Sequence, residues 1–441
     1  MGDGRVRFDV GGTTFITSTT TIANAGQGSM LSALIDGRWH QPSDAGIFLD
    51  RDPSYFAVLL ELLRTGELHV PPGMSRRALH REALFYGLLD HVKEAQRGPL
   101  NGNLVECRAS ISGRAIGDGI AIRASSDGGC CVAHETMVHV YDWALEEKQP
   151  LTLDYVSVND MGFLNPERVV ICTYERGEQI GGMACFNVNT GEIEHRYQVT
   201  HEGQGKNFPA LAFASNHRHV FASCRKRISD YGIGVWDQTT GEHLDFFHDS
   251  EGTHLGDARK LQWLPQSNVL FVASLYPQSD NSFISLLDFR MKQKAWTWTD
   301  SKMRSSDDKL VMDTVAMDER STVCVVNQYD NLGFIDTRLS QQAVKWNHMY
   351  THAKLSESEE HCYSRLAACG SQVYASRRDN VLVYCCSDKE ATRCIQTANL
   401  SKEGRGTISD IAIGGDRLFV LQAEENLFDV WETPILHGVG C

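Results

Sequence analysis

Residues 7–16 read RFDVGGTTFI, residues 48–56 read FLDRDPSYF and residues 62–68 read LLRTGEL. In the first stretch, apolar and polar residues alternate before Gly11 and Gly12, and residues 13–16 follow as the candidate returning strand. This pattern is typical of two half-buried strands that are joined by a tight turn. The first stretch therefore predicts a β-hairpin at the start of the chain.

The second and third stretches predict a helix. Asp52 stands where an N-cap is expected and Pro53 where the first helical residue is expected. Apolar residues follow at helical spacing from Phe56 to Leu63, and Gly66 can end the helix in a left-handed conformation. Capping signals of the same kind predict a helix that begins after Ser29 and ends at Gly37 and another that begins after Ser75, and the apolar residues 47–49 predict a short buried strand. Together these elements predict a small α/β domain.

In this order, the stretches resemble the tetramerisation-type BTB/POZ domain of voltage-gated potassium channels and of adaptor proteins. The resemblance covers residues 5–92 and implies a domain that assembles subunits and recruits partners. It implies core, capping or subunit-interface roles for the residues of the motif: Gly11, Gly12, Asp50, Arg51, Asp52, Phe56 and Arg64. Some channel domains hold zinc between subunits with His and Cys, but residues 1–100 contain no cysteine, so no such site is expected.

A polar segment rich in turn formers follows at residues 93–103 and is predicted to be a linker. Beyond it, a short strand that ends in an apolar residue and a polar one recurs. The copies end at residues 142, 187, 237, 288, 336, 385 and 432. Each unit of about 50 residues also contains three further candidate strands, which is the pattern of a β-propeller blade.

The repeats resemble WD repeats, although most copies lack the Gly-His dipeptide that opens a standard WD repeat. They predict a seven-bladed WD-like β-propeller over residues 104–441. Because only nine residues follow Glu432, the last blade lacks a clear outer strand. We expect the strand predicted over residues 104–111 to complete it, so that both ends of the domain close the ring. The fold class is therefore multidomain, with a BTB/POZ domain followed by an all-β propeller.

Charge and hydropathy exclude several classes of function. The net charge is −14, of which residues 1–100 carry only −1, and an acidic propeller argues against nucleic acid and anionic membranes as partners. No apolar run is long enough to span a bilayer, so the chain is not expected to be a channel subunit. No signal peptide is visible, and a cytoplasmic location is expected, with the nucleus as the alternative. The 13 cysteines are accordingly expected to be reduced core residues.

No motif for catalysis, a cofactor or a metal is evident. GxSxG, HExxH and Walker motifs are absent from the sequence. Cys130, Cys131 and His134 are close in sequence, but strand alternation directs them to different faces, as it does for His361 and Cys362. Trp296 and Trp298 fall on one face of a strand and are expected to pack between blades. No catalytic residue, cofactor or metal is therefore expected.

The pair of domains is similar to plant BTB/POZ proteins with a C-terminal propeller, and this resemblance implies a non-enzymatic adaptor. BTB proteins of this kind form homo-tetramers or pentamers and commonly dock on cullin-3 of a RING ubiquitin ligase, while a second domain holds the protein substrate. The surface facing cullin would then include residues 37–45 and the end of the helix after Ser75, with Phe85 and Tyr86. The alternative is an oligomeric scaffold for signalling or cytoskeletal proteins that binds no cullin, and a propeller enzyme has the least support.

Overall fold

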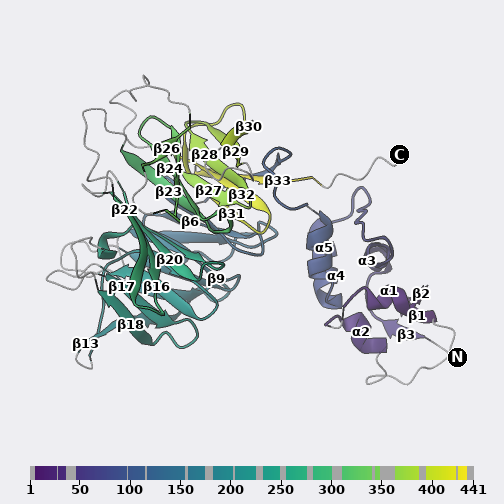
Figure 1. The fold of residues 1–441 in the computed structure, drawn as a ribbon. Helices are drawn as coiled ribbons and strands as arrows, with labels where there is room; N and C mark the ends of the chain where they lie inside the picture. The colour runs from purple at the N-terminus through teal and green to yellow at the C-terminus, as the bar shows by residue number, and fades with distance from the viewer. Residues whose placement is uncertain are drawn as a thin grey trace. The chain divides into compact units, whose positions relative to one another are not determined.

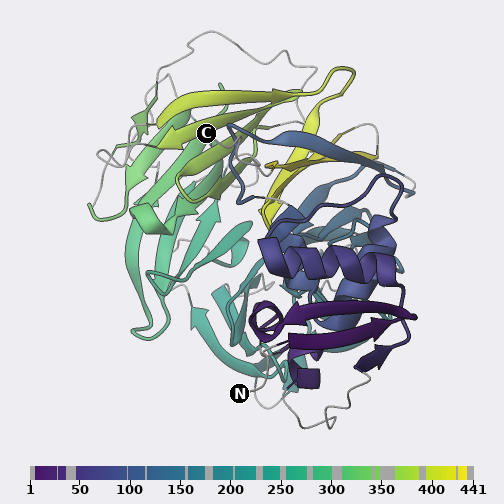
Figure 2. The same cartoon turned by 90° about the vertical axis from the view of Figure 1, so that its right-hand side faces the viewer.

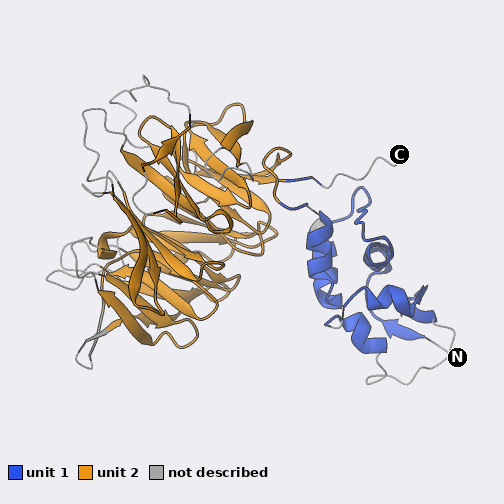
Figure 3. Cartoon of the chain, viewed as in Figure 1, with its two compact units in different colours: residues 1–99, 433–441 blue, residues 100–432 orange. Residues whose placement is uncertain are grey.

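The structure is a computed structural model of residues 1–441 (Figure 1). It describes the chain except for residues 1–4, 27, 36–45, 97, 115–116, 154–156, 174–181, 202–203, 225–231, 249–254, 276–281, 300–309, 340–342, 348–362, 387–393, 424–425 and 435–441. The chain divides into two compact units, which Figure 3 shows in different colours. One comprises residues 1–99 and 433–441, and the other comprises residues 100–432.

The first unit is a small α/β domain. Its three-stranded sheet has the order β2-β1-β3, in which β1 and β2 form an antiparallel hairpin and β3 lies parallel to β1. Gly11 adopts a φ of 52° in the hairpin turn, and a Cβ there would lie 2.6 Å from the carbonyl oxygen of Arg51. The elements are β1 (Arg5–Val10), β2 (Thr13–Ser18), α1 (Thr19–Ala23), α2 (Met30–Ile35), β3 (Ile47–Leu49), α3 (Pro53–Thr65), α4 (Arg76–Tyr86) and α5 (Leu89–Gln96).

The predicted helix signals are confirmed at α3 and α4. The Asp52 carboxylate accepts the Ser54 N–H at 2.8 Å, and Gly66 ends α3 with a φ of 76°. The Ser75 hydroxyl caps α4 by accepting the Ala78 N–H at 3.3 Å. Among the described helices, none combines the length and the apolar character that crossing a bilayer requires.

The predicted linker begins too early, because helix α5 continues through residue 96. The prediction missed this helix since its apolar residues are few. Val92 is nevertheless fully buried against the core of the domain, with Leu89 and Ala95 partly buried beside it. Three apolar contacts on one face are enough to hold a short helix whose other residues are polar.

In the described part of the second unit, seven four-stranded sheets follow one another along the chain (Figures 1 and 2). We number these blades 1 to 7 in the order of their first strands. Blade 1 comprises β5 (Ala121–Ala124), β6 (Cys130–His134), β7 (Met137–Tyr141) and β8 (Leu151–Thr152); blade 2 comprises β9 (Val158–Asn165), β10 (Arg168–Thr173), β11 (Met183–Asn187) and β12 (Ile193–Tyr197); and blade 3 comprises β15 (Ala210–Ser215), β16 (His219–Cys224), β17 (Gly232–Asp237) and β18 (His243–His248). Blade 4 comprises β19 (Lys260–Leu264), β20 (Val269–Ser274), β21 (Phe283–Asp288) and β22 (Gln293–Thr299), and blade 5 comprises β23 (Val311–Met317), β24 (Thr322–Asn327), β25 (Leu332–Asp336) and β26 (Lys345–Trp346). Blade 6 comprises β27 (Leu366–Cys369), β28 (Gln372–Arg377), β29 (Asn380–Cys386) and β30 (Cys394–Ser401), and blade 7 comprises β31 (Ile408–Gly414), β32 (Arg417–Gln422), β33 (Leu427–Glu432) and β4 (Glu106–Ser112). A separate hairpin, β13 (Val199–His201) and β14 (Gln204–Lys206), connects blades 2 and 3, and short 3₁₀ turns lie at Leu255–Asp257 and Asp318–Arg320.

Strand β4 is the outer strand of blade 7. It pairs antiparallel with β33, from Glu106 opposite Glu432 to Ser112 opposite Leu427. The Asp429 carboxylate of β33 is 1% exposed and accepts hydrogen bonds from the Ser110 hydroxyl of β4 and from Arg405 at 3.0 Å. Main-chain pairing and a buried charged contact therefore hold the two ends of the propeller together.

The recurring polar residue of the sequence repeat has a structural role. Five of the seven predicted copies end at the last residue of a third strand, and the other two end within one residue of it. In blades 1 to 5 the side chain of this residue accepts a backbone N–H two positions later, at 2.8–3.0 Å. These residues are Asp142, Asn187, Asp237, Asp288 and Asp336. In these five blades the repeat thus encodes a turn that leads the third strand into the outer strand.

The cores lie within the first unit and between neighbouring blades. Cys131 packs between blades 1 and 2, whereas Cys130 packs against blade 7 on the other face of β6. Trp296 and Trp298 pack together between blades 4 and 5. The predicted opposite faces of the adjacent cysteines and the inter-blade position of the two tryptophans are confirmed.

Candidate interaction sites

The end of helix α4 presents apolar surface. Leu84 is 65% exposed and Phe85 is 41% exposed. The Arg51 guanidinium lies over the Phe85 ring, 4.3 Å from its centroid, and donates two hydrogen bonds to Glu82 of the same helix, at 3.0 and 2.6 Å. Arg51 therefore restrains the Phe85 ring by packing over it, while part of the ring stays exposed.

Tyr86 cannot contact a partner directly, in contrast to the prediction. Its side chain has no exposed surface and packs against Phe56, with ring centroids 5.2 Å apart. Burial raises the pKa of the Tyr86 phenol. Phe56 is also a core residue, at 1% exposure. Of the two predicted cullin-facing residues, only Phe85 is available, because successive residues of a helix point in different directions and Tyr86 points inward.

The other residues of the motif are mostly structural. Gly12 occupies the hairpin turn with a φ of 86°, and Asp50 is exposed. Arg64 donates to the carbonyl oxygen of Ile16 at 3.2 Å, which joins α3 to β2. The predicted cullin-facing segment 37–45 lies outside the described residues.

The sheet of the first unit has a second exposed apolar surface. Ile16 is 59% exposed and lies opposite Arg7, while Phe48 is 62% exposed and lies opposite Asp9. Residues that are directly opposite in a sheet share a face. This face thus carries two apolar side chains with a cation and an anion between them.

The first strands of the seven blades line a cavity of about 880 Å³. Its lining is both polar and apolar, and its charged members come from several blades: Arg123, Asp160, Arg259, Lys260, Asp313, Arg365 and Asp410. Because all the first strands contribute, the cavity is the central channel of the propeller.

Three buried aspartates tie neighbouring blades together along this channel. Each carboxylate accepts the backbone N–H of the following first strand: Asp160 from Phe213 at 3.1 Å, Asp313 from Leu366 at 2.7 Å and Asp410 from Ile122 at 3.1 Å. The three side chains are at most 9% exposed. A buried carboxylate requires such donors, and here they come from the adjacent blade.

Cations complete a polar belt, which we define as Arg123, Asp160, Lys260, Asp313, Arg365 and Asp410 with their backbone partners. Arg123 bridges blades 2 and 7, with Asp160 at 2.9 Å and Asp410 at 2.7 Å. Lys260 of blade 4 contacts Asp313 of blade 5 at 2.8 Å, and Arg365 contacts the Ser409 carbonyl oxygen at 3.4 Å. The belt therefore crosses six interfaces between blades.

Burial disfavours the charged forms of side chains in the belt. Burial raises the pKa of the Asp160 carboxyl by more than Arg123 and the Phe213 N–H lower it. Burial also disfavours the charged form of Arg123, but Asp160 and Asp410 outweigh it and raise the pKa of the guanidinium. Sequence reasoning missed the belt, although its aspartates interrupt otherwise apolar strands.

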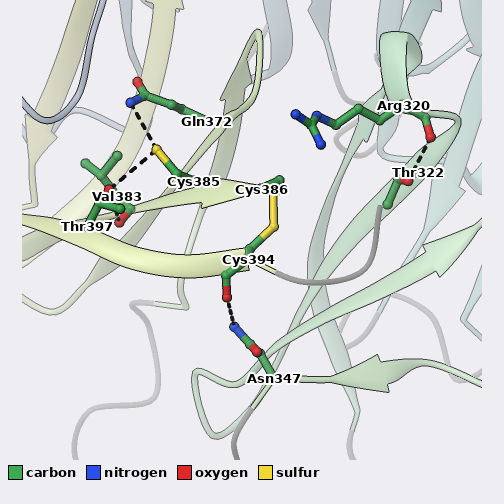
Figure 4. Close-up of a disulfide and its surroundings, with 9 residues drawn as sticks. All are labelled: Arg320, Thr322, Asn347, Gln372, Val383, Cys385, Cys386, Cys394 and Thr397. Atoms are coloured by element: carbon green, nitrogen blue, oxygen red, sulfur yellow. Dashed lines mark hydrogen bonds between the residues drawn. A yellow bond between two sulfur atoms is a disulfide. The ribbon is translucent and has the colours of Figure 1, made fainter. Parts of the chain in front are cut away.

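The prediction that every cysteine is reduced is wrong at Cys386 and Cys394, which form a disulfide (Figure 4). The two residues lie directly opposite each other on β29 and β30. The prediction failed because sequence spacing does not reveal which residues face each other across a hairpin. Nearby, burial raises the pKa of the Cys385 thiol, but hydrogen bonds from Gln372, Thr397 and Asn103 outweigh burial and leave it lowered.

The segment that contains Cys130, Cys131 and His134 is a buried hairpin of β6 and β7. His134 and His139 are 4% and 3% exposed, and their rings meet edge to face with centroids 5.4 Å apart. Glu147 holds the His139 Nδ1 at 2.7 Å. Burial and the neighbouring His139 lower the pKa of His134. In the part of the chain that the structure describes, no group of three or more His, Cys, Asp or Glu side chains is placed to bind a metal.

Comparison with known proteins identifies both units. Residues 113–433 match the family model "At2g24240-like, C-terminal beta propeller", and residues 6–95 match the BTB/POZ domain model. The chain is 46% identical to the BTB/POZ domain-containing protein At4g30940 and 47% identical to At2g24240, both from Arabidopsis thaliana, over 98% of this chain and of each relative. BTB/POZ domain-containing protein KCTD3 from Homo sapiens is 42% identical over 90 residues, which are 20% of this chain and 11% of that protein. The chain therefore belongs to the At2g24240-like family of BTB/POZ domain-containing proteins, which join a BTB domain to a C-terminal β-propeller.

Proposed function

We propose that this protein is a homo-oligomeric substrate adaptor of a cullin-3 RING ubiquitin ligase. The BTB domain docks on cullin-3 and the propeller holds the protein to be modified. The observation that carries the proposal is the exposed pair Leu84 and Phe85 on a BTB domain that is joined to a propeller. In this role the protein performs no chemistry itself and acts in the cytoplasm or nucleus.

The α4 surface is suited to docking. An aromatic side chain that is held in place and partly exposed loses little conformational entropy when a partner covers it. The bidentate contact of Arg51 with Glu82 and its position over Phe85 supply that restraint. Leu84 adds apolar area one residue earlier.

The exposed face of the sheet β2-β1-β3, which residues other than Leu84 and Phe85 form, supports self-association. Ile16 and Phe48 offer apolar area, and Arg7 and Asp9 between them offer charges that a second copy can complement. Several propellers in one assembly would strengthen weak substrate contacts through avidity.

The test is co-elution of the full chain with the N-terminal domain of cullin-3, with light scattering to give the mass. We expect a stoichiometric complex for the wild type. Leu84→Asp and Phe85→Ala should each weaken it at least about tenfold, as expected for residues at the centre of an interface.

Leu244→Asp is the matched control, since Leu244 is a 53% exposed leucine on the propeller. It should leave the complex unchanged. A homo-oligomer that binds no cullin would refute the ligase role and leave the scaffold of signalling or cytoskeletal proteins. Normal binding by Phe85→Ala would remove the α4 surface from the proposal.

A further inference from the structure

Among the described residues of the polar belt, the arc from blade 4 to blade 6 contains two cations, Lys260 and Arg365, and one anion, Asp313. Lys260 belongs to blade 4, Asp313 to blade 5 and Arg365 to blade 6. The Lys260 ammonium is 2.8 Å from Asp313 and 3.5 Å from the carbonyl oxygen of Leu366, the neighbour of Arg365. Asp313 is already engaged by Lys260 and the Leu366 N–H. Its single charge does not balance the two cations around it.

Arg365 is the cation of the belt with the least compensation. It is half-buried, and within the described residues its side chain makes one hydrogen bond, from Nε to the Ser409 carbonyl oxygen at 3.4 Å. Arg123, by contrast, has two carboxylate partners on the opposite arc. A guanidinium presents five N–H donors in a planar fork that matches a carboxylate or a phosphate. Only the Nε–H of Arg365 is used in the hydrogen bond to Ser409, so within the described residues its other N–H groups can donate to a carboxylate or a phosphate.

We propose that this arc of the channel binds a carboxylate or phosphate group carried by an acidic segment of a partner protein. The inference rests on the proposed function and gives the propeller's substrate a chemical class. Arg365 and Lys260 form the anion site, and the segment enters the channel to reach them.

The size and charge of the channel favour a protein segment. A cavity of about 880 Å³ is far larger than a single anion and has room for several side chains. On the opposite arc, two aspartates surround Arg123, so the channel has a positive and a negative side that can orient a bound segment. The whole chain carries a net charge of −14, which repels acidic peptides in general. Binding of an acidic peptide would therefore require a local positive site.

The test measures fluorescence anisotropy of a labelled peptide with a central run of glutamates, titrated with the full chain. The same peptide with glutamines is the neutral control, and a phosphoserine version distinguishes phosphate from carboxylate as the bound group. We expect the glutamate or phosphoserine peptide to bind at least tenfold more tightly than the glutamine peptide. Arg365→Gln should lower that affinity at least tenfold, and added salt should weaken it.

Two further variants separate recognition from folding. Arg365→Lys keeps the charge but loses the planar fork, so its affinity should lie between that of the wild type and that of Arg365→Gln. Arg338→Gln removes a 64% exposed arginine from a blade 5 turn and should change nothing. A thermal melt of each variant checks that the propeller remains folded. Equal binding of the glutamine peptide, or unchanged binding by folded Arg365→Gln, would overturn the inference. So would a site that binds inorganic phosphate alone as well as it binds either acidic peptide. Cullin binding is measured in the separate co-elution experiment, whose variants lie in the BTB domain, so these outcomes leave the proposed function standing or falling on its own experiment.

Discussion

Replacement of Asp160 by alanine should destabilise the propeller strongly. The carboxylate is 7% exposed and accepts hydrogen bonds from Arg123 at 3.1 and 2.9 Å and from the Phe213 N–H at 3.1 Å. Alanine would leave a buried N–H without an acceptor and Arg123 with one carboxylate instead of two. Removing one member of a buried ion pair costs about 3–5 kcal/mol. Because the Arg123 side chain is 37% exposed and still pairs with Asp410, we expect the lower end, about 3 kcal/mol in the free energy of unfolding.

Urea unfolding followed by tryptophan fluorescence measures this loss. Seven of the eight tryptophans lie in residues 100–432, so the signal reports mainly on the propeller. The matched control is Arg108→Ala, which removes one member of an ion pair with Glu106 whose side chains are 47% and 59% exposed. Exposed pairs contribute at most about 1 kcal/mol. If Asp160→Ala cost no more than Arg108→Ala, the belt would not hold the blades together and our reasoning would be refuted.

Three further predictions concern closure, pH and redox state. Burial raises the pKa of Asp429, but hydrogen bonds from Ser110, Arg405 and Lys402 outweigh burial and leave the pKa lowered. The Asp429 carboxylate therefore stabilises the fold above about pH 4, and this stabilisation is lost as the pH falls through the lowered pKa. Asp429→Asn should accordingly be less stable at neutral pH and less sensitive to acid, and equal acid sensitivity in an unfolding titration would contradict this. The lowered pKa of His134 means that its neutral form stabilises the fold above about pH 6.5 and that this contribution is lost on acidification; His134→Phe should flatten the fall in stability between roughly pH 7 and pH 5, and an unchanged slope would count against it. Reduction of the disulfide between Cys386 and Cys394 should lower the free energy of unfolding by about 2.5 kcal/mol, whereas Cys394→Ser should be as unstable with or without dithiothreitol.

Local signals in the sequence predicted much of the fold. Asp52-Pro53 placed the start of α3, and the repeated polar residue placed the ends of the third strands, because both act on backbone groups within a few positions. Helix α5 and the hairpin β13–β14 were missed because short elements with few apolar residues give weak periodicity.

The candidate sites were predicted less well, since they depend on contacts between distant residues. Nothing local links Arg123 to Asp410, although the folded ring brings them to 2.7 Å. The resemblance to BTB domains located the end of α4, but it did not distinguish the exposed Phe85 from the buried Tyr86. That distinction requires the direction of each side chain on the helix, which packing against Phe56 decides.

The pairing of β4 with β33 sets an order of events during translation. The ribosome makes β4 just after the BTB domain, but its partner β33 emerges only after the strands of all the other blades. In the proposed oligomer, BTB domains can therefore assemble while each propeller is still an open ring on a nascent chain. Unpaired strand edges in neighbouring nascent subunits can exchange, so that β4 of one subunit completes blade 7 of another. Closure of each propeller within its own chain thus competes with strand exchange between subunits. This competition is strongest in oligomers whose BTB domains assemble before β33 has been synthesised.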